Sequence, residues 1–221
     1  MIDKLKRLIR KRYNISFSKS GDDIQLMKLI NNNAPGVYVD IGCWHPIKAS
    51  NTYFFHLRKW KGICIDPNPK LKSLYKKYRP SDNFINAGIG DSETLLKYYM
   101  LEESSMNTFS YDFVEKQKLE SKVMNTINVP VYNLKDILDK NLKENDRLDF
   151  FDVDVEGLDL EVLKTNDWNK YRPKVVVVES DISIKQDVKS EITEYLELQN
   201  YRLIGKSNIN GDLGNLFFLS N

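Results

Sequence analysis

The chain has 221 residues, of which 41% are hydrophobic and 29% charged, and this balance excludes a disordered chain and a small disulfide-rich domain. Thirty-three Lys and Arg side chains stand against thirty-one Asp and Glu, so the formal net charge of +2 gives no overall field that would recruit nucleic acid or an anionic membrane. We expect one globular domain that is large enough to bury a substantial core.

The first 34 residues are predicted to be an N-terminal helical segment, and residues 35–221 to form the main domain. Basic side chains alternate with apolar ones over residues 2–12, which predicts a short basic amphipathic helix. Packing of this helix on the domain is favoured over contact with a membrane or a nucleic acid. A second helix is expected over 23–30, because apolar residues recur there at helical spacing before the Asn residues at 31–33.

Strands and helices alternate through the first half of the main domain. Apolar runs at 36–42 and 62–66 predict two buried parallel strands, with helical segments at 51–59 and 71–78. A third strand is expected at 83–89, and an irregular strand or hairpin at 94–100. Residues 102–128 are polar and poorly periodic, which predicts a mobile insertion or lid.

The same alternation continues through the second half. A short strand at 129–131 and a helix at 134–142 precede a main strand at 148–157 and a helix at 158–164. Four consecutive valines mark a strand at 173–179, which is followed by a helix at 187–199 and a hairpin of 201–204 with 216–219. This order predicts an α/β fold with a Rossmann-like, doubly wound, mostly parallel sheet and a C-terminal antiparallel hairpin.

The two cysteines, Cys43 and Cys64, lie in or beside apolar strand-like runs and lack the spacing of metal ligands. This usage indicates a reducing compartment. No apolar run approaches the length of a membrane span, and the charged start lacks the pattern of a secretory signal. We therefore expect a cytoplasmic protein without stable membrane insertion.

Four acids, Asp40, Asp66, Asp154 and Glu179, end separate predicted strands. Ligands of doubly wound sheets bind outside the carboxyl ends of the strands, so these acids should converge on a ligand site. Gly42 would let the backbone approach a ligand closely, while Asp66 can bind both hydroxyls of a ribose. Because the chain has only this glycine where a G-x-G-x-x-G would bind NAD, a different adenosine-bearing cofactor is favoured over a dehydrogenase site.

The chain resembles the FkbM family of methyltransferases over residues 20 to 219. The segments that carry the resemblance run in the family's order, and the most distinctive of them is the Asp-Val-Glu-Gly run with the helix after it. They are residues 38–42, 50–52, 60–69, 86–91 and 154–163.

The resemblance implies a class I methyltransferase fold that binds S-adenosylmethionine. Asp40 and Gly42 would line its methionine side, Asp66 would hold the ribose, and Asn86 with Asp91 would lie near the adenine. The turn at 43–46 departs from the glycine-rich turn of many relatives, and its tryptophan, Trp44, is expected to touch ligand. Further cofactor-binding candidates are Asn51, Pro67 and Asn68.

Methyl transfer from a sulfonium to a hydroxyl requires alignment of the two reactants and a proton acceptor. Asp154 is predicted to accept or position that proton, with Glu156 and His45 as further catalytic candidates. Alternatively, Asp154, Glu179 and His45 would bind a divalent metal, since carboxylates with an imidazole suit Mg, Mn or ferrous iron. The structural alternative is that acids at strand ends cap helices, as Glu156 would do before Gly157.

The predicted activity is O-methylation of a sugar hydroxyl, on a nucleotide sugar or glycoconjugate precursor for surface polysaccharide. This acceptor is implied by the resemblance alone. The alternatives are another small metabolite, such as a polyketide or a lipid-linked acceptor, and a catalytically silent cofactor-binding protein. A nucleic-acid acceptor is disfavoured, and an oligomer is left open. Asn107 and Thr108 in the predicted insertion are either ligand contacts or ordinary polar loop residues.

Overall fold

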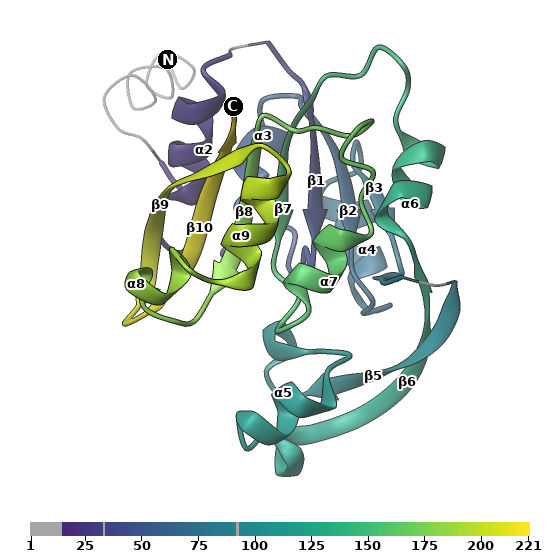
Figure 1. Ribbon diagram of the computed structural model, residues 1–221. Helices are drawn as coiled ribbons and strands as arrows, with labels where there is room; N and C mark the ends of the chain where they lie inside the picture. The colour runs from purple at the N-terminus through teal and green to yellow at the C-terminus, as the bar shows by residue number, and fades with distance from the viewer. Residues whose placement is uncertain (1–14, 33, 92) are drawn as a thin grey trace.

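The computed structural model of the chain describes residues 15–32, 34–91 and 93–221 (Figure 1). The basic amphipathic helix predicted over residues 2–12 lies outside these ranges. Within them, no helix is long and apolar enough to cross a membrane.

A seven-stranded sheet forms the centre of the protein, in the order β3-β2-β1-β7-β8-β10-β9. The first five strands in this order are parallel, whereas β10 runs antiparallel to both β8 and β9. The predicted mostly parallel sheet with a C-terminal antiparallel hairpin is confirmed. The strands are β1 (Val37–Ile41), β2 (Lys61–Ile65), β3 (Asn83–Ile85), β7 (Leu148–Val153), β8 (Val175–Ser180), β9 (Tyr201–Asn210) and β10 (Leu213–Ser220).

Helices cover both faces of this sheet, because its central strands are apolar on both sides. In β7, Phe150 packs into one core and Phe151 into the other, as the twofold alternation of a strand requires. One core includes residues of α2 (Asp22–Ile30), α3 (Tyr53–His56) and α4 (Leu71–Tyr78), and the opposite core includes residues of α6 (Leu134–Asn141), α7 (Asp159–Lys164) and α9 (Glu191–Leu198). The short α8 (Ile184–Asp187) precedes α9. The helix predicted over 51–59 is real but shorter.

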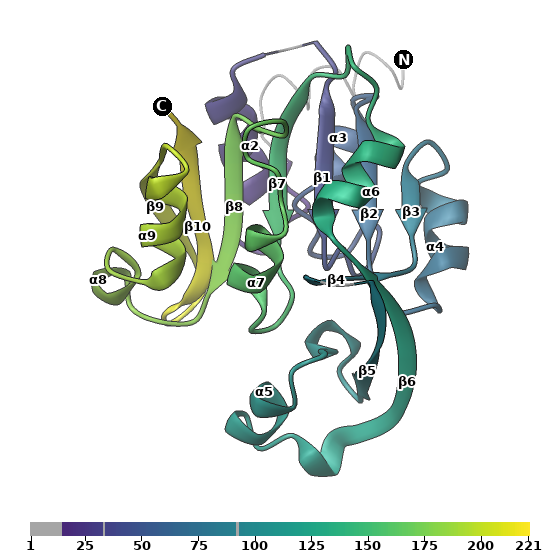
Figure 2. The same cartoon turned by 45° about the vertical axis from the view of Figure 1, so that its right-hand side comes forward.

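A three-stranded sheet, β4-β6-β5, extends beyond the carboxyl ends of the main strands (Figure 2). The prediction of one strand over 83–89 was wrong, since Ala87 donates to the carbonyl of Ile85 and separates β3 from β4. The predicted insertion over 102–128 also contains regular structure and half of a long strand. These elements are β4 (Gly88–Ile89), β5 (Thr94–Leu101), η1 (Ser104–Met106), α5 (Tyr111–Lys116), η2 (Glu120–Lys122) and β6 (Val123–Tyr132).

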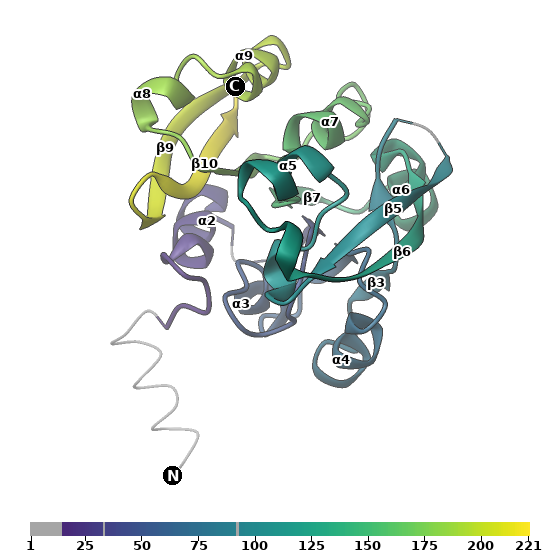
Figure 3. The ribbon, with the colours of Figure 1, turned by 90° about the horizontal axis from the view of Figure 1, so that it is seen from below.

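The strand order reverses between β1 and β7. From β1 the chain adds β2 and β3 on one side, and it later returns to place β7 on the other side of β1. Ligands of open α/β sheets bind at the carboxyl ends of the strands at this point. Seen from below in Figure 3, α5 and the segment around it lie across this end of the sheet. We refer to residues 102–122 as the lid.

Candidate functional site

Gly42 brings the end of β1 against the end of β7. Its φ of +80° lies in the left-handed region, and a Cβ atom at this position would come within 1.7 Å of the carbonyl oxygen of Asp154. Its amide donates to the carbonyl of Ile65 at 2.9 Å. Only glycine satisfies both the backbone conformation and the close approach. Gly42 therefore brings the carboxyl ends of β1, β2 and β7 together at one point.

A mainly apolar pocket opens beside this turn, and we refer to it as the inner pocket. It encloses about 540 Å³ of empty space, including its opening, which is in the range of roughly 300–1,000 Å³ for small-molecule sites. Its polar floor is Asp66, which accepts hydrogen bonds from the amides of Trp44 at 2.9 Å and Asn68 at 2.8 Å. Burial raises the pKa of Asp66 to about 7, although both amides favour the charged form. Pro67 and Trp44 also line the pocket.

Two residues that were predicted to lie near the adenine, Asn86 and Asp91, lie outside the wall of the inner pocket. Asn86 donates through Nδ2 to the carbonyls of Asp66 at 3.0 Å and Pro67 at 2.9 Å, so it braces the turn after β2. Asp91 is exposed, and its carbonyl accepts a hydrogen bond from Asn133. Neither side chain lines the pocket. The pocket is lined at this side by Ala87, Gly88 and Ile89.

A polar pocket of about 540 Å³ adjoins the inner pocket and shares Gly42 and Asp154 with it. Asp40 lies in its wall, accepts a hydrogen bond from Thr52, and lies 3.9 Å from Nη1 of the buried Arg79. Burial raises the pKa of Asp40 to about 6, against the opposing effect of Arg79. Asn51, also in the wall, donates to Asp152 at 3.1 Å.

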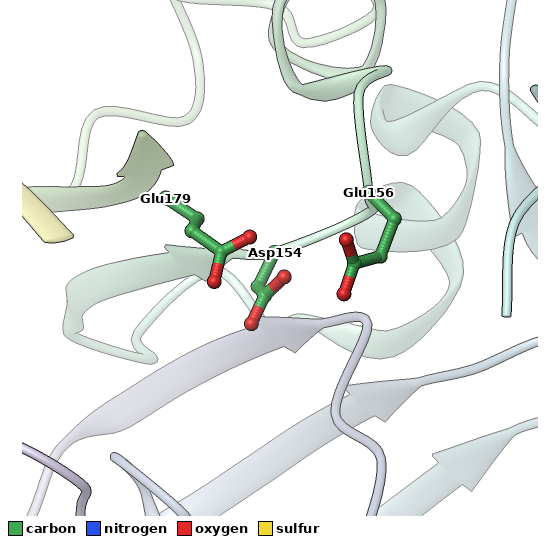
Figure 4. A group of neighbouring side chains, drawn as sticks. All are labelled: Asp154, Glu156 and Glu179. Atoms are coloured by element: carbon green, nitrogen blue, oxygen red, sulfur yellow. The ribbon is translucent and has the colours of Figure 1, made fainter. Parts of the chain in front are cut away.

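Three carboxylates, those of Asp154, Glu156 and Glu179, converge where β7 and β8 end (Figure 4). Each offers an oxygen within 4.8 Å of the others. Burial and then the charge of Asp154 raise the pKa of Glu156 to about 8 and that of Glu179 to about 10, and burial also raises the pKa of Asp154. We refer to these three residues as the acid triad. At neutral pH it holds protons that isolated carboxyl groups would lose.

The alternative that Glu156 caps a helix is wrong. Helix α7 has Leu158 as its N-cap and shows no side-chain capping bond. Glu156 instead has a φ of +53°, which is unusual for a residue other than glycine. Its carbonyl accepts a hydrogen bond from Thr108 of the lid at 3.1 Å.

His45 lies near the acid triad but is not one of its members. It lines the polar pocket together with Asp154 and Glu156. Its Nδ1 accepts the amides of Ile47 at 3.1 Å and Lys48 at 3.0 Å, and burial lowers its pKa. The neutral ring therefore carries its proton on Nε2 and presents a donor, not a free lone pair, to a ligand.

A large open cleft begins at the acid triad and runs beneath the lid. It measures about 2030 Å³ including open solvent, and Glu156 and Glu179 lie in its wall. Glu156 and Ser105 also line both smaller pockets, so the three spaces meet at these residues. The cleft is strongly acidic, because Lys19 and Lys116 are its only basic side chains among the described residues. Further carboxylates in its wall are Glu103, Asp159, Glu161, Asp181, Asp187, Glu191 and Asp212.

The lid contributes residues to the inner pocket that sequence patterns did not single out. Phe109 of the lid forms part of its wall, together with Tyr98 of β5, the strand that leads into the lid. Trp44, which was expected to touch ligand, lines both smaller pockets and donates from Nε1 to Ser104 of the lid at 3.0 Å. No local pattern marks such contacts, because they depend on where the long β5 and β6 strands return the chain.

Comparison with known proteins identifies the family of the chain. A family profile described as "Methyltransferase FkbM domain" matches residues 36–203, a range that includes all four strand-end acids. No curated protein matches the chain. Among solved structures, the precorrin-6y C5,15-methyltransferase of Geobacter metallireducens is 12% identical, with a TM-score of 0.47 over 89% of this chain and 86% of that one. The O-methyltransferase TomG of Streptomyces achromogenes, in complex with SAM, is 10% identical, with a TM-score of 0.47 over 90% and 79% of the two chains.

Proposed function

Because the chain belongs to the FkbM methyltransferase family, we propose that this S-adenosylmethionine-dependent methyltransferase transfers its methyl group to a hydroxyl of a sugar or sugar-bearing precursor. The observation that carries this proposal is the position of the acid triad. It lies where the inner pocket, which suits a cofactor, meets an open cleft that suits an acceptor. A hydroxyl acceptor must lose a proton during transfer, and carboxylates at this junction can receive it.

The cofactor would span the two smaller pockets. Asp66 would bind the ribose hydroxyls in the inner pocket, since a carboxylate retains acceptor capacity beyond two backbone amides. Pro67 would border the adenosine, and Asn68 would hold the Asp66 carboxylate in place through its amide. The polar pocket would take the methionine end, whose ammonium and carboxylate groups suit its polar wall, including Asp40 and Asn51.

The reaction is an in-line displacement at the transferred methyl carbon. The acceptor oxygen forms a bond to this carbon as the carbon–sulfur bond breaks, and its electrons stay on the sulfur of S-adenosylhomocysteine. Asp154 would take the hydroxyl proton. Glu179, whose pKa is about 10, keeps its own proton at neutral pH and hydrogen-bonds to Asp154. The raised pKa of Asp154 makes it a stronger base than an ordinary carboxylate, which favours proton transfer.

The charge of the cleft bears on the acceptor. Its many carboxylates and two lysines would attract a neutral or cationic sugar more strongly than a bare diphosphate. A nucleotide sugar would therefore enter more readily with a divalent cation between its phosphates and the cleft wall. A role in surface-polysaccharide or glycoconjugate assembly is compatible with either form of acceptor.

A metal-assisted reaction is the second candidate, and the crowding of the acid triad favours it. Asp154, Glu156 and Glu179 supply the hard oxygen ligands that Mg or Mn ions prefer. His45 fits less well, because both backbone amides occupy its Nδ1 lone pair. A bound ion would lower the pKa of an acceptor hydroxyl. The triad residues would hold the ion and orient the acceptor.

Calorimetric titration with S-adenosylhomocysteine tests the cofactor site. The wild type should bind, and Asp66→Ala should bind about tenfold more weakly or worse, because a charge-assisted hydrogen bond to ribose is lost. Asp149→Ala is the matched control, since Asp149 is an equally buried acid at the amino end of β7, bonded to Arg147. Absence of binding by a folded wild type would contradict the proposal, whereas binding would justify screening neutral sugars and nucleotide sugars for methyl transfer.

A further inference from the structure

Asn107 of the lid has a buried donor without a partner. Its side chain is only 8% exposed, and its Oδ1 accepts the amide of Leu101 at 2.8 Å. Nδ2 has no hydrogen-bond partner within the described part of the chain. The backbone amide of Leu101 requires an acceptor, so the carboxamide cannot turn over to exchange its two ends.

This donor belongs to the inner pocket. Asn107 lines that pocket with Tyr98 and Phe109 and does not line the polar pocket. The Tyr98 hydroxyl is the neighbouring acceptor, and the Asn107 amide lowers the pKa of this hydroxyl while burial raises it overall, but the two groups do not meet hydrogen-bond geometry. An unsatisfied buried donor costs about 1–3 kcal/mol, so its retention beside a ligand pocket indicates that a bound ligand supplies the acceptor.

The adenine ring fits this requirement. Its faces are apolar, as is most of the pocket wall formed by Ala87, Gly88 and Ile89, and its edge carries three ring nitrogens that accept hydrogen bonds. The carboxylate of the methionine end, the other strong acceptor of the cofactor, would lie in the polar pocket. We propose that Asn107 donates from Nδ2 to a ring nitrogen of the adenine and is a specificity-determining residue for the cofactor. This inference rests on the cofactor site proposed above.

The chain contains a natural control in Asn166. It is also 8% exposed and also has one unpartnered side-chain atom, Oδ1, while its Nδ2 donates to the carbonyl of Tyr171 at 3.0 Å. Asn166 lines none of the three ligand spaces. The unpartnered atom of Asn166 is an acceptor and not a donor. Replacement of Asn166 should therefore affect packing without affecting recognition of the base.

The experiment measures binding of S-adenosylhomocysteine and of its 1-deaza, 3-deaza and 7-deaza adenine analogues by calorimetry. The wild type should bind one of the three analogues about tenfold more weakly than the parent, because one buried donor then loses its acceptor. Asn107→Asp, which keeps an acceptor for Leu101 and removes the donor, should bind the parent more weakly and bind that analogue no worse than the parent. Asn166→Ala should discriminate as the wild type does.

Two results would overturn the inference. Equal binding of all four compounds by the wild type would show that no ring nitrogen is read, and this result requires no variant to fold. If Asn107→Asp still binds the parent compound more tightly than the deaza analogue, another residue recognises the ring nitrogen. Failure of the wild type to bind the parent compound would instead defeat the cofactor site itself, so the two failures are distinguishable.

Discussion

Two sets of acids occupy the same end of the sheet, and they differ in how their charges are satisfied. Asp40 and Asp66 each have fixed partners: Thr52 and Arg79 for the first, and backbone amides for the second. The members of the acid triad, Asp154, Glu156 and Glu179, each offer an oxygen within 4.8 Å of the others. Burial raises the pKa of all three, and the charge of Asp154 raises the pKa of Glu156 and Glu179 further.

We propose that this difference separates ligand binding from proton transfer. An acid with fixed partners keeps a defined orientation and suits recognition of a ligand group, as Asp66 does in the inner pocket. Acids that repel one another gain free energy from a proton, a cation or a substrate group, and such perturbed carboxyls are typical of catalytic sites. The predictions below test whether the two sets act separately.

The largest effect is expected for Gly42→Ala, which would push the β1 turn away from Asp154 and move the two sets apart. The new Cβ would meet the Asp154 carbonyl oxygen at 1.7 Å in a left-handed conformation. We expect the free energy of unfolding to fall by about 3 kcal/mol or more and cofactor binding to be lost. Urea denaturation and calorimetry measure both.

Gly205→Ala is the control for this substitution. It makes the same chemical change where a Cβ would meet nothing within 4 Å. Its stability should stay within about 0.5 kcal/mol of the wild type. A Gly42→Ala protein that folds and binds as the wild type does would show that the close approach is dispensable.

The next effect is expected for Asp154→Asn, which removes the proposed proton acceptor with little change of shape. Release of S-adenosylhomocysteine in the presence of an acceptor that the wild type methylates should slow about 10²–10⁴-fold, while cofactor affinity changes much less. Asp149→Asn changes a buried acid at the amino end of β7, whereas Asp154 follows the carboxyl end of this strand, so the Asp149→Asn protein should retain the rate. An unchanged rate in Asp154→Asn would show that a group other than Asp154 accepts the proton.

Much of the seven-stranded sheet could be predicted from the sequence, because buried parallel strands are apolar on both faces. The runs at 36–42 and 173–179 mark β1 and β8, and each ends in the predicted acid region. The first half of β6 could not be predicted in the same way. Residues 123–128 are largely exposed and show no alternation, and they form a strand only because β5 offers its backbone for pairing.

The site was predictable to a similar degree. Strand-end acids such as Asp66 and Asp154 were identified because topology alone brings them to one edge. The placement of Asn86 could not be inferred, since its amide turns back to brace the β2 turn. Nor could Asn107 be assigned a role, because its unpartnered donor depends on the return of the lid over the inner pocket.

The smallest effect is a change in the slope of stability against pH, and it distinguishes a proton from a metal in the acid triad. The folded-state pKa values of Glu156 and Glu179, about 8 and about 10, exceed the ordinary value, so the folded protein holds protons that the unfolded chain releases. Their contribution is fully present below about pH 4 and is lost as pH rises through the folded-state values. Stability should therefore fall between pH 6 and 9, by about 1 kcal/mol per pH unit for each protonated group.

Urea unfolding of three proteins at several pH values checks this expectation. Glu179→Gln should flatten the decline, whereas Glu161→Gln, which changes an exposed acid of the same cleft, should leave the decline unchanged. Millimolar manganese provides the last distinction. If the triad holds a metal, manganese should stabilise the wild type increasingly above pH 7, because the ion replaces the protons, and Glu179→Gln should lose this stabilisation. No stabilisation by manganese at any pH would leave the triad with the proton-accepting role alone.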